Sequence, residues 1–208
     1  MKFKLITILT AIFLTSSTVS ATTFFSFDSS NSSWVGQGES VFVTPDDGYI
    51  FIPSDLNSFN HVEIMVASLN SPYGPNWNPS SGDPYNYWTL DLAAPFNKPL
   101  EIGFYDDAAR YPFQDDDQPG LTLSGNHRGN NKNSGFFTLS EIAFDNNGAL
   151  LSLSVDFTQY GEGDESRWIS GSLHYNSTAP VPEPATMLLF GTGLVGFIGS
   201  RLKKNILH

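Results

Sequence analysis

The sequence predicts an all-β domain, and three observations carry that prediction. Short runs of alternating apolar and polar residues are separated by clusters of Gly, Pro, Asn and Asp. Aromatic residues, which favour sheet over helix, are abundant, with 17 Phe, 8 Tyr and 4 Trp. No stretch of the central sequence sustains a helical apolar period. We therefore expect an antiparallel, jelly-roll-like β-sandwich over residues 22–178.

Nine segments fit the strand pattern. In chain order they are residues 24–28, 40–44, 49–53, 61–68, 87–93, 100–105, 136–144, 150–159 and 168–175. The clearest pair is a hairpin over residues 136–159, whose Asp-Asn-Asn-Gly turn at 145–148 tolerates positive φ. The return strand alternates through Leu151, Leu153, Val155 and Phe157. We expect this hairpin to be antiparallel and near the centre of the sheet.

Residues 1–21 predict a cleavable secretory signal peptide with a short apolar helix. Lys2 and Lys4 precede an apolar run over residues 5–14, and a cleavage site of small residues ends at Ala21. That run is far shorter than the ~20 residues that a spanning helix needs, which disfavours the alternative of an uncleaved anchor. We expect export through the Sec translocon and cleavage by signal peptidase after Ala21.

Residues 179–205 combine three parts in order. Prolines keep the triplet Pro182, Glu183 and Pro184 extended and accessible. An apolar segment then begins at Ala185 and ends at Ser200, and as a helix it would reach about 24 Å into a ~30 Å bilayer core. The positive-inside rule places the basic residues that follow on the cytoplasmic side, and these are Arg201, Lys203 and Lys204. We expect a short transmembrane helix here.

This three-part tail resembles the PEP-CTERM sorting signal of exported bacterial proteins. The resemblance implies that exosortase, a membrane protease-transpeptidase, recognises Pro-Glu-Pro and cleaves near it. The tail would then anchor the protein in the inner membrane only until it is cleaved. It also implies a Gram-negative bacterium that makes extracellular polysaccharide, with the mature protein at the cell surface or in the matrix. A plain single-pass anchor with a proline-rich stalk is the alternative.

The central domain also resembles a recurrent domain of proteins that bear this tail. The resemblance rests on residues 103–106, 120–126, 128–131 and 173–177. It implies a location outside the cytoplasm and no particular activity.

Composition argues against several classes of function. Residues 22–178 hold five basic and 20 acidic side chains, a net charge of −15 that repels nucleic acid. The chain has no cysteine, which excludes disulfides and Cys-ligated metals. The four His residues lack metal-ligand spacing, and no Gly-x-Ser-x-Gly elbow occurs. A Gly-x-Gly-x-x-Gly match at 191–196 lacks the βαβ context of a dinucleotide site. We expect no catalytic residues and no enzyme.

Two loops hold candidate binding residues. Asp115, Asp116 and Asp117 could give Ca²⁺ hard oxygen ligands, with a solvated acidic loop as the alternative. Residues 71–88 combine four prolines with aromatic rings that could stack on sugars, or could pack under the loop as a satellite core. These aromatic residues are Tyr73, Trp77, Tyr85, Tyr87 and Trp88.

The sequence therefore favours a non-enzymatic surface or extracellular-matrix protein, sorted by exosortase and associated with exopolysaccharide or biofilm. A Ca²⁺-dependent adhesion or carbohydrate-binding module is one alternative. A carbohydrate-active enzyme with a pair of loop carboxylates is the other. No cofactor is expected unless the aspartate loop binds Ca²⁺.

Overall fold

The computed structural model describes residues 20–54 and 58–180, and their regular structure is all β. The strands are β1 (Thr22–Ser29), β2 (Ser40–Val43), β3 (Tyr49–Pro53), β4 (His61–Ser68), β5 (Tyr87–Ala93), β6 (Gly103–Ala109), β7 (Gly120–Gly125), β8 (Asn133–Phe144), β9 (Leu150–Gly161) and β10 (Trp168–Ser177). Helical structure in these residues is limited to the 3₁₀ turns η1 (Pro45–Asp47), η2 (Pro95–Asn97) and η3 (Glu165–Arg167). The all-β prediction is confirmed, whereas the two predicted terminal helices lie outside the described residues.

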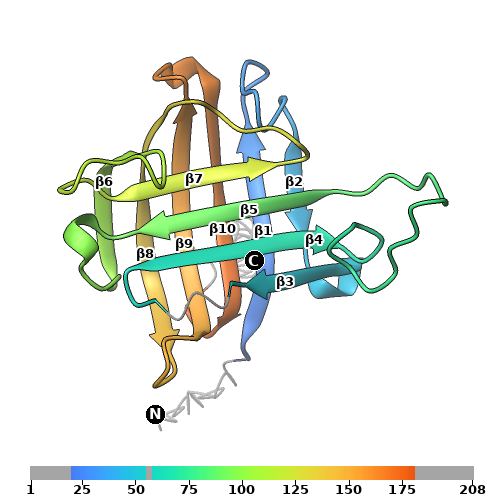
Figure 1. The fold of residues 1–208 in the computed structure, drawn as a ribbon, viewed down its shortest axis with the longest axis horizontal. Helices are drawn as coiled ribbons and strands as arrows, with labels where there is room; N and C mark the ends of the chain where they lie inside the picture. The colour runs from blue at the N-terminus through green and yellow to red at the C-terminus, as the bar shows by residue number, and fades with distance from the viewer. Residues whose placement is uncertain (1–19, 55–57, 181–208) are drawn as a thin grey trace, which may run out of the picture. The chain divides into compact units, whose positions relative to one another are not determined.

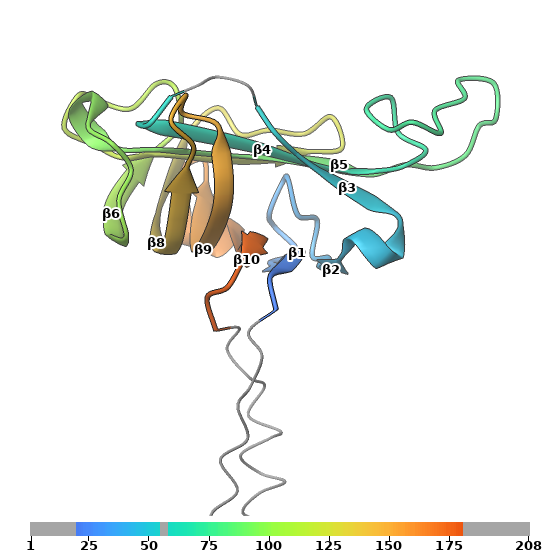
Figure 2. The same cartoon turned by 90° about the horizontal axis from the view of Figure 1, so that it is seen from below.

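The ten strands form one continuous sheet in the order β2-β1-β10-β9-β8-β6-β7-β5-β4-β3. The sheet is folded into two layers, in which β3, β4, β5 and β7 run across β1, β2, β8, β9 and β10 (Figure 1). Figure 2 shows the two layers edge-on, with β6 at the turn between them. Neighbouring strands are antiparallel except β6 and β7, which pair in parallel at Ala109 and Gly120. A folded, mixed sheet thus replaces the purely antiparallel sandwich expected from the sequence.

Most strand predictions match the structure closely, and three match to the residue: β3, β4 and β5. Strand β7 was not predicted, because its Gly-Leu-Thr-Leu-Ser-Gly sequence is short and bounded by glycines. Its two leucines are nevertheless fully buried, and it pairs along its length with β5. The strand expected at 100–105 begins later, at Gly103, and continues past a register shift to Ala109.

The hairpin of β8 and β9 confirms the clearest pairing prediction. The two strands are antiparallel and occupy the middle of the sheet order. Leu153, Val155 and Phe157 are buried as the alternation predicts, but Leu151 is exposed. A register shift next to the turn pairs Ser152 with Ala143 and Leu150 with Phe144, which leaves Leu151 without a partner across the strands.

The core lies between the two layers and is rich in aromatic rings. The Trp88 ring lies 5.6 Å from that of Phe25 and 5.8 Å from that of Phe27, measured between centroids. Gly125 is the register partner of Trp88 on β7. A Cβ at that position would come within 2.4 Å of the Trp88 ring, so the indole can pack there only against glycine.

One buried polar side chain joins the two layers. Gln159 of β9 is fully buried, and its Oε1 accepts a hydrogen bond from the Leu123 N–H at 2.6 Å. Its Nε2 donates to the Leu123 carbonyl at 3.1 Å. Because β6 meets β7 at a single residue pair, this edge of β7 has no strand partner at Leu123. The Gln159 amide supplies the hydrogen bonds that a neighbouring strand would otherwise make.

Candidate functional site

The connection between β4 and β5 gathers four of the five predicted aromatic residues into one cluster. The Tyr73 ring lies 5.1 Å from Tyr87, and the Trp77 ring lies 5.2 Å from Tyr85. Tyr85 and Tyr87 are 6.4 Å apart, so the four rings are contiguous. Tyr73 is 46% exposed and Trp77 is 38% exposed. Figure 1 shows their loop reaching well beyond the ends of β4 and β5.

A histidine from the loop after β7 completes this cluster. The Nδ1 of His127 lies 3.1 Å from the Tyr87 hydroxyl, and its Nε2 lies 3.5 Å from the Tyr85 hydroxyl. The backbone N–H of His127 also donates to the Tyr87 hydroxyl at 3.0 Å. We call Tyr73, Trp77, Tyr85, Tyr87 and His127 the aromatic cluster. His127 was not a predicted site residue, because 40 residues separate it from Tyr87 and only the pairing of β5 with β7 unites them.

Asparagine side chains hold the base of this loop. The Asn70 side chain donates to the Pro84 carbonyl at 2.9 Å, which ties the two ends of the loop together. Asn126 Oδ1 accepts from the Tyr87 N–H at 2.9 Å, and its Nδ2 donates to Asn86 Oδ1 at 3.1 Å. These bonds fix the start of β5 against the loop after β7 and thereby hold Tyr87 beside His127.

Trp88 does not belong to the cluster, contrary to the sequence-based prediction. It is only 3% exposed and packs in the core against Phe25 and Phe27. The reason is the two-residue period of a strand, which points Tyr87 outward and its neighbour Trp88 inward. Trp88 thus lies in the main core of the domain, and neither on a sugar-stacking surface nor in a satellite core under the loop.

The cluster offers ring faces and polar groups on one surface. A cavity of about 290 Å³ beside it is lined by Asp83, Pro84, Tyr85, Tyr87, Asn126 and His127. Tyrosine and tryptophan combine a large apolar face with a polar edge, and Tyr73 and Trp77 present theirs to solvent on a proline-rich loop. Sugars match this arrangement because they present apolar ring faces edged by hydroxyl groups.

The predicted calcium ligands are not brought together. Asp115, Asp116 and Asp117 are all exposed in the β6–β7 loop. Over residues 20–54 and 58–180, no three His, Cys, Asp or Glu side chains converge as a metal site would require. The Gln118 N–H donates to the Asp115 carbonyl at 3.0 Å, so the three aspartates lie in a turn, and their adjacency in sequence does not by itself bring their carboxylates together around an ion. This geometry does not support the calcium-site prediction.

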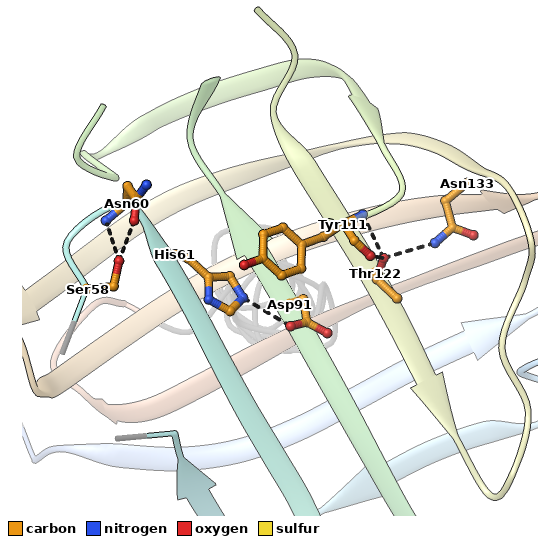
Figure 3. A network of polar contacts seen from close by, with 7 residues as sticks. All are labelled: Ser58, Asn60, His61, Asp91, Tyr111, Thr122 and Asn133. Atoms are coloured by element: carbon orange, nitrogen blue, oxygen red, sulfur yellow. Dashed lines mark hydrogen bonds and ion pairs between the residues drawn. The ribbon is translucent and has the colours of Figure 1, made fainter. Parts of the chain in front are cut away.

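A second polar network, which the sequence did not predict, lies on the outer face of β4 and β5. His61 Nε2 is 3.0 Å from Asp91 Oδ1, and the Tyr111 ring stacks on His61 at 4.0 Å (Figure 3). The Tyr111 N–H donates to Thr122 Oγ1 at 3.0 Å, and Asn133 donates to the same oxygen at 3.3 Å. These contacts fasten the start of the β6–β7 loop to the sheet.

Charge is concentrated in this network. Burial is the main cause that raises the pKa of Glu63, and the neighbouring Asp91 carboxylate raises it further while His61 opposes the change. Burial also raises the pKa of Tyr111, with added contributions from Asp91 and Glu63. A very small cavity adjoins His61, and the hydrogen bonds and ring stacking of this network hold the start of the β6–β7 loop against the sheet.

The predicted sorting residues lie outside the described part of the chain. These are Pro182, Glu183, Pro184, the segment from Ala185 to Ser200, and Arg201, Lys203 and Lys204. Ala21, the expected signal-peptide cleavage position, is described and exposed, directly before β1. Within residues 20–54 and 58–180, no helix has the length and apolar character needed to cross a membrane.

Comparison with known proteins identifies the tail. Residues 180–204 match the family model described as the PEP-CTERM protein-sorting motif, which falls within the predicted boundaries of 179–205. No curated protein and no solved structure gives a significant match to the chain. The motif implies export and processing by exosortase. The chain therefore carries a PEP-CTERM protein-sorting motif at residues 180–204.

Proposed function

We propose that this protein is a non-enzymatic component of the cell surface or extracellular matrix, which exosortase releases from the inner membrane and which binds extracellular polysaccharide. The sorting motif supports the route, because it implies a membrane-held tail that is processed outside the cytoplasm. The observation that carries the binding role is the aromatic cluster, where Tyr73 and Trp77 lie exposed on a long loop and pack against Tyr87 and Tyr85.

The route is tested by intact mass spectrometry of the protein from native cells, separated into inner membrane, outer membrane and medium. A product that begins near Thr22, ends near residues 182–184 and occurs outside the inner membrane is the expected result. Full-length protein confined to the inner membrane would instead make the tail a permanent anchor.

The motif itself is tested by substitution within the triplet. Glu183→Ala, or deletion of residues 182–184, is expected to leave the protein in the inner membrane at its unprocessed mass. The matched control is Glu165→Ala, which removes one exposed carboxylate from the folded domain and should not alter processing. Delivery of the Glu183→Ala protein to the surface at the normal mass would contradict the proposal.

The binding role is tested by removing two exposed rings. A Tyr73→Ala, Trp77→Ala double variant should lose binding to the native extracellular polysaccharide by about tenfold or more, since each stacked ring contributes of order 1 kcal/mol. Trp34→Ala is the matched control, because Trp34 is also exposed but lies in the β1–β2 loop. Equal binding by the double variant and the control would exclude the cluster as the site.

A further inference from the structure

The outer face of the layer formed by β2, β1, β10, β9 and β8 carries a groove unrelated to the aromatic cluster. The groove has a volume of about 670 Å³, and its walls come from all five strands. Figure 2 shows this layer on the side of the domain opposite β4 and β5, while the aromatic loop extends from the β4–β5 layer. The two surfaces are therefore separate.

Strand register arranges the outward side chains of this face in two rows. Residues directly opposite one another in antiparallel pairs project from the same face of a sheet. The first row is Ser40, Asp28, Ser170, Thr158 and Phe136. The second row is Phe42, Ser26, Ser172, Asp156, Thr138 and Phe104. Each row thus has a polar middle, and at least one end is a phenylalanine.

The polar middle is a network of hydroxyls and carboxylates. Ser40 donates to Asp28, Ser172 donates to Asp156, and the Thr158 and Ser170 hydroxyls are 2.9 Å apart. These bonds hold the side chains in fixed positions across neighbouring strands. Each hydroxyl oxygen can still accept a further hydrogen bond, and each carboxylate has several acceptor positions. The face can therefore bond a ligand rich in hydroxyl groups.

Exposed phenylalanines flank this polar middle. Phe42 is 65% exposed on β2 and its ring stacks with Phe24 at 5.5 Å. On the other side, Phe104 of β6 is 62% exposed and lies 5.9 Å from Phe136. Four strand spacings separate β2 from β8, about 19 Å, a length that spans several sugar rings. Large apolar side chains this exposed on a solvent face point to a binding surface.

We propose that this groove binds an extended strand of uncharged polysaccharide, laid across the five strands. Sugar ring faces would stack on Phe42 at one end and on Phe104 or Phe136 at the other, with hydroxyl groups bonded to the row of Ser, Thr and Asp between. The groove lining includes Asp28 and Asp156 and no Lys or Arg among the described residues, which disfavours polyanions such as uronic acid polymers. This inference rests on the proposed function, in which the exported protein binds extracellular polysaccharide, but it does not depend on the aromatic cluster.

The test is affinity electrophoresis of the protein recovered from its native cells. Native gels contain hydroxyethylcellulose, dextran or alginate, and retardation measures binding to each. We expect retardation by at least one neutral polymer and none by alginate. Phe42→Ala and Phe104→Ala should each weaken neutral-polymer binding by about tenfold. Asp156→Asn, which keeps the shape of the groove, should weaken it less and should not create alginate binding on its own.

Two controls separate binding in the groove from binding elsewhere and from loss of folding. Phe113→Ala removes an equally exposed ring from the β6–β7 loop and should bind as the unchanged protein does. Each variant should keep the melting temperature of the unchanged protein, since the substituted rings are exposed. The Tyr73→Ala, Trp77→Ala variant reports on the aromatic cluster in the same gels, so failure of one site does not decide the other.

Several results would overturn the inference. They are an absence of retardation in both neutral gels, stronger retardation in alginate, and unchanged binding by Phe42→Ala and Phe104→Ala. A concentration-dependent dimer that Phe42→Ala abolishes would identify a second copy of the chain, and not a glycan, as the occupant. Loss of neutral-polymer binding in the groove variants, with binding kept by the aromatic-cluster variant, would support the groove alone.

Discussion

Replacing Gln159 with leucine should destabilise the domain far more than an ordinary polar-to-apolar change. The Gln159 amide makes two hydrogen bonds to the backbone of Leu123, and the side chain is fully buried between the layers. Gln159→Leu has a similar volume but leaves the Leu123 N–H and carbonyl without partners. An unsatisfied buried group costs about 1–3 kcal/mol, so the expected loss in the free energy of unfolding is about 2–5 kcal/mol after the small gain from added apolar surface.

Urea denaturation followed by tryptophan fluorescence measures this loss, because buried Trp88 reports on the core. The midpoint should fall while the slope stays the same, since the surface exposed on unfolding is nearly unchanged. Thr138→Val on the adjacent strand β8 is the matched control, because its side chain is exposed, and it should stay within about 0.5 kcal/mol. A loss below about 1 kcal/mol for Gln159→Leu would refute the idea that this amide replaces a missing strand at β7.

Three further predictions concern the core and pH. Trp88→Ala should lower the free energy of unfolding by about 3–5 kcal/mol, because Trp88 is buried in the core. Trp34→Ala should change it very little, because Trp34 is exposed. Equal losses for the two variants in urea denaturation would contradict a core role for Trp88. Burial lowers the pKa of His174 below 6.5, so as the pH falls the unfolded chain binds a proton before the folded chain does, and the free energy of unfolding should decrease below about pH 6.5. His174→Asn should remove this decrease. An unchanged dependence of stability on pH in the variant would contradict the prediction. Burial and Asp91 raise the pKa of Glu63 above 4.5, so the contribution of this side chain to folding stability is complete below that pH and is lost as the pH rises through the folded-state pKa. Glu63→Gln should therefore stabilise the protein at pH 7. A lower melting temperature of the variant at pH 7 would refute this.

Local patterns in the sequence were enough to predict nine strands, the β8–β9 hairpin and the sorting tail. Alternation located nine of the ten strands, because burial on one face of a sheet imposes a two-residue period. The PEP-CTERM motif could be recognised because a linear triplet, an apolar segment and a basic cluster need no tertiary contact. Proline and aromatic content likewise marked the loop that carries Tyr73 and Trp77.

What the sequence could not supply depends on strand order and register. Alternation separates Tyr87 from Trp88 but does not say which of them faces the core until the second layer is in place. His61 meets Asp91, and His127 meets Tyr87, only because β4, β5 and β7 are neighbours. The groove depends most on tertiary structure, because its two rows of outward side chains combine residues of β1 and β10, the first and last strands of the domain. Pairings between distant segments are chosen by the packing of the whole core, so only the tertiary structure decided them.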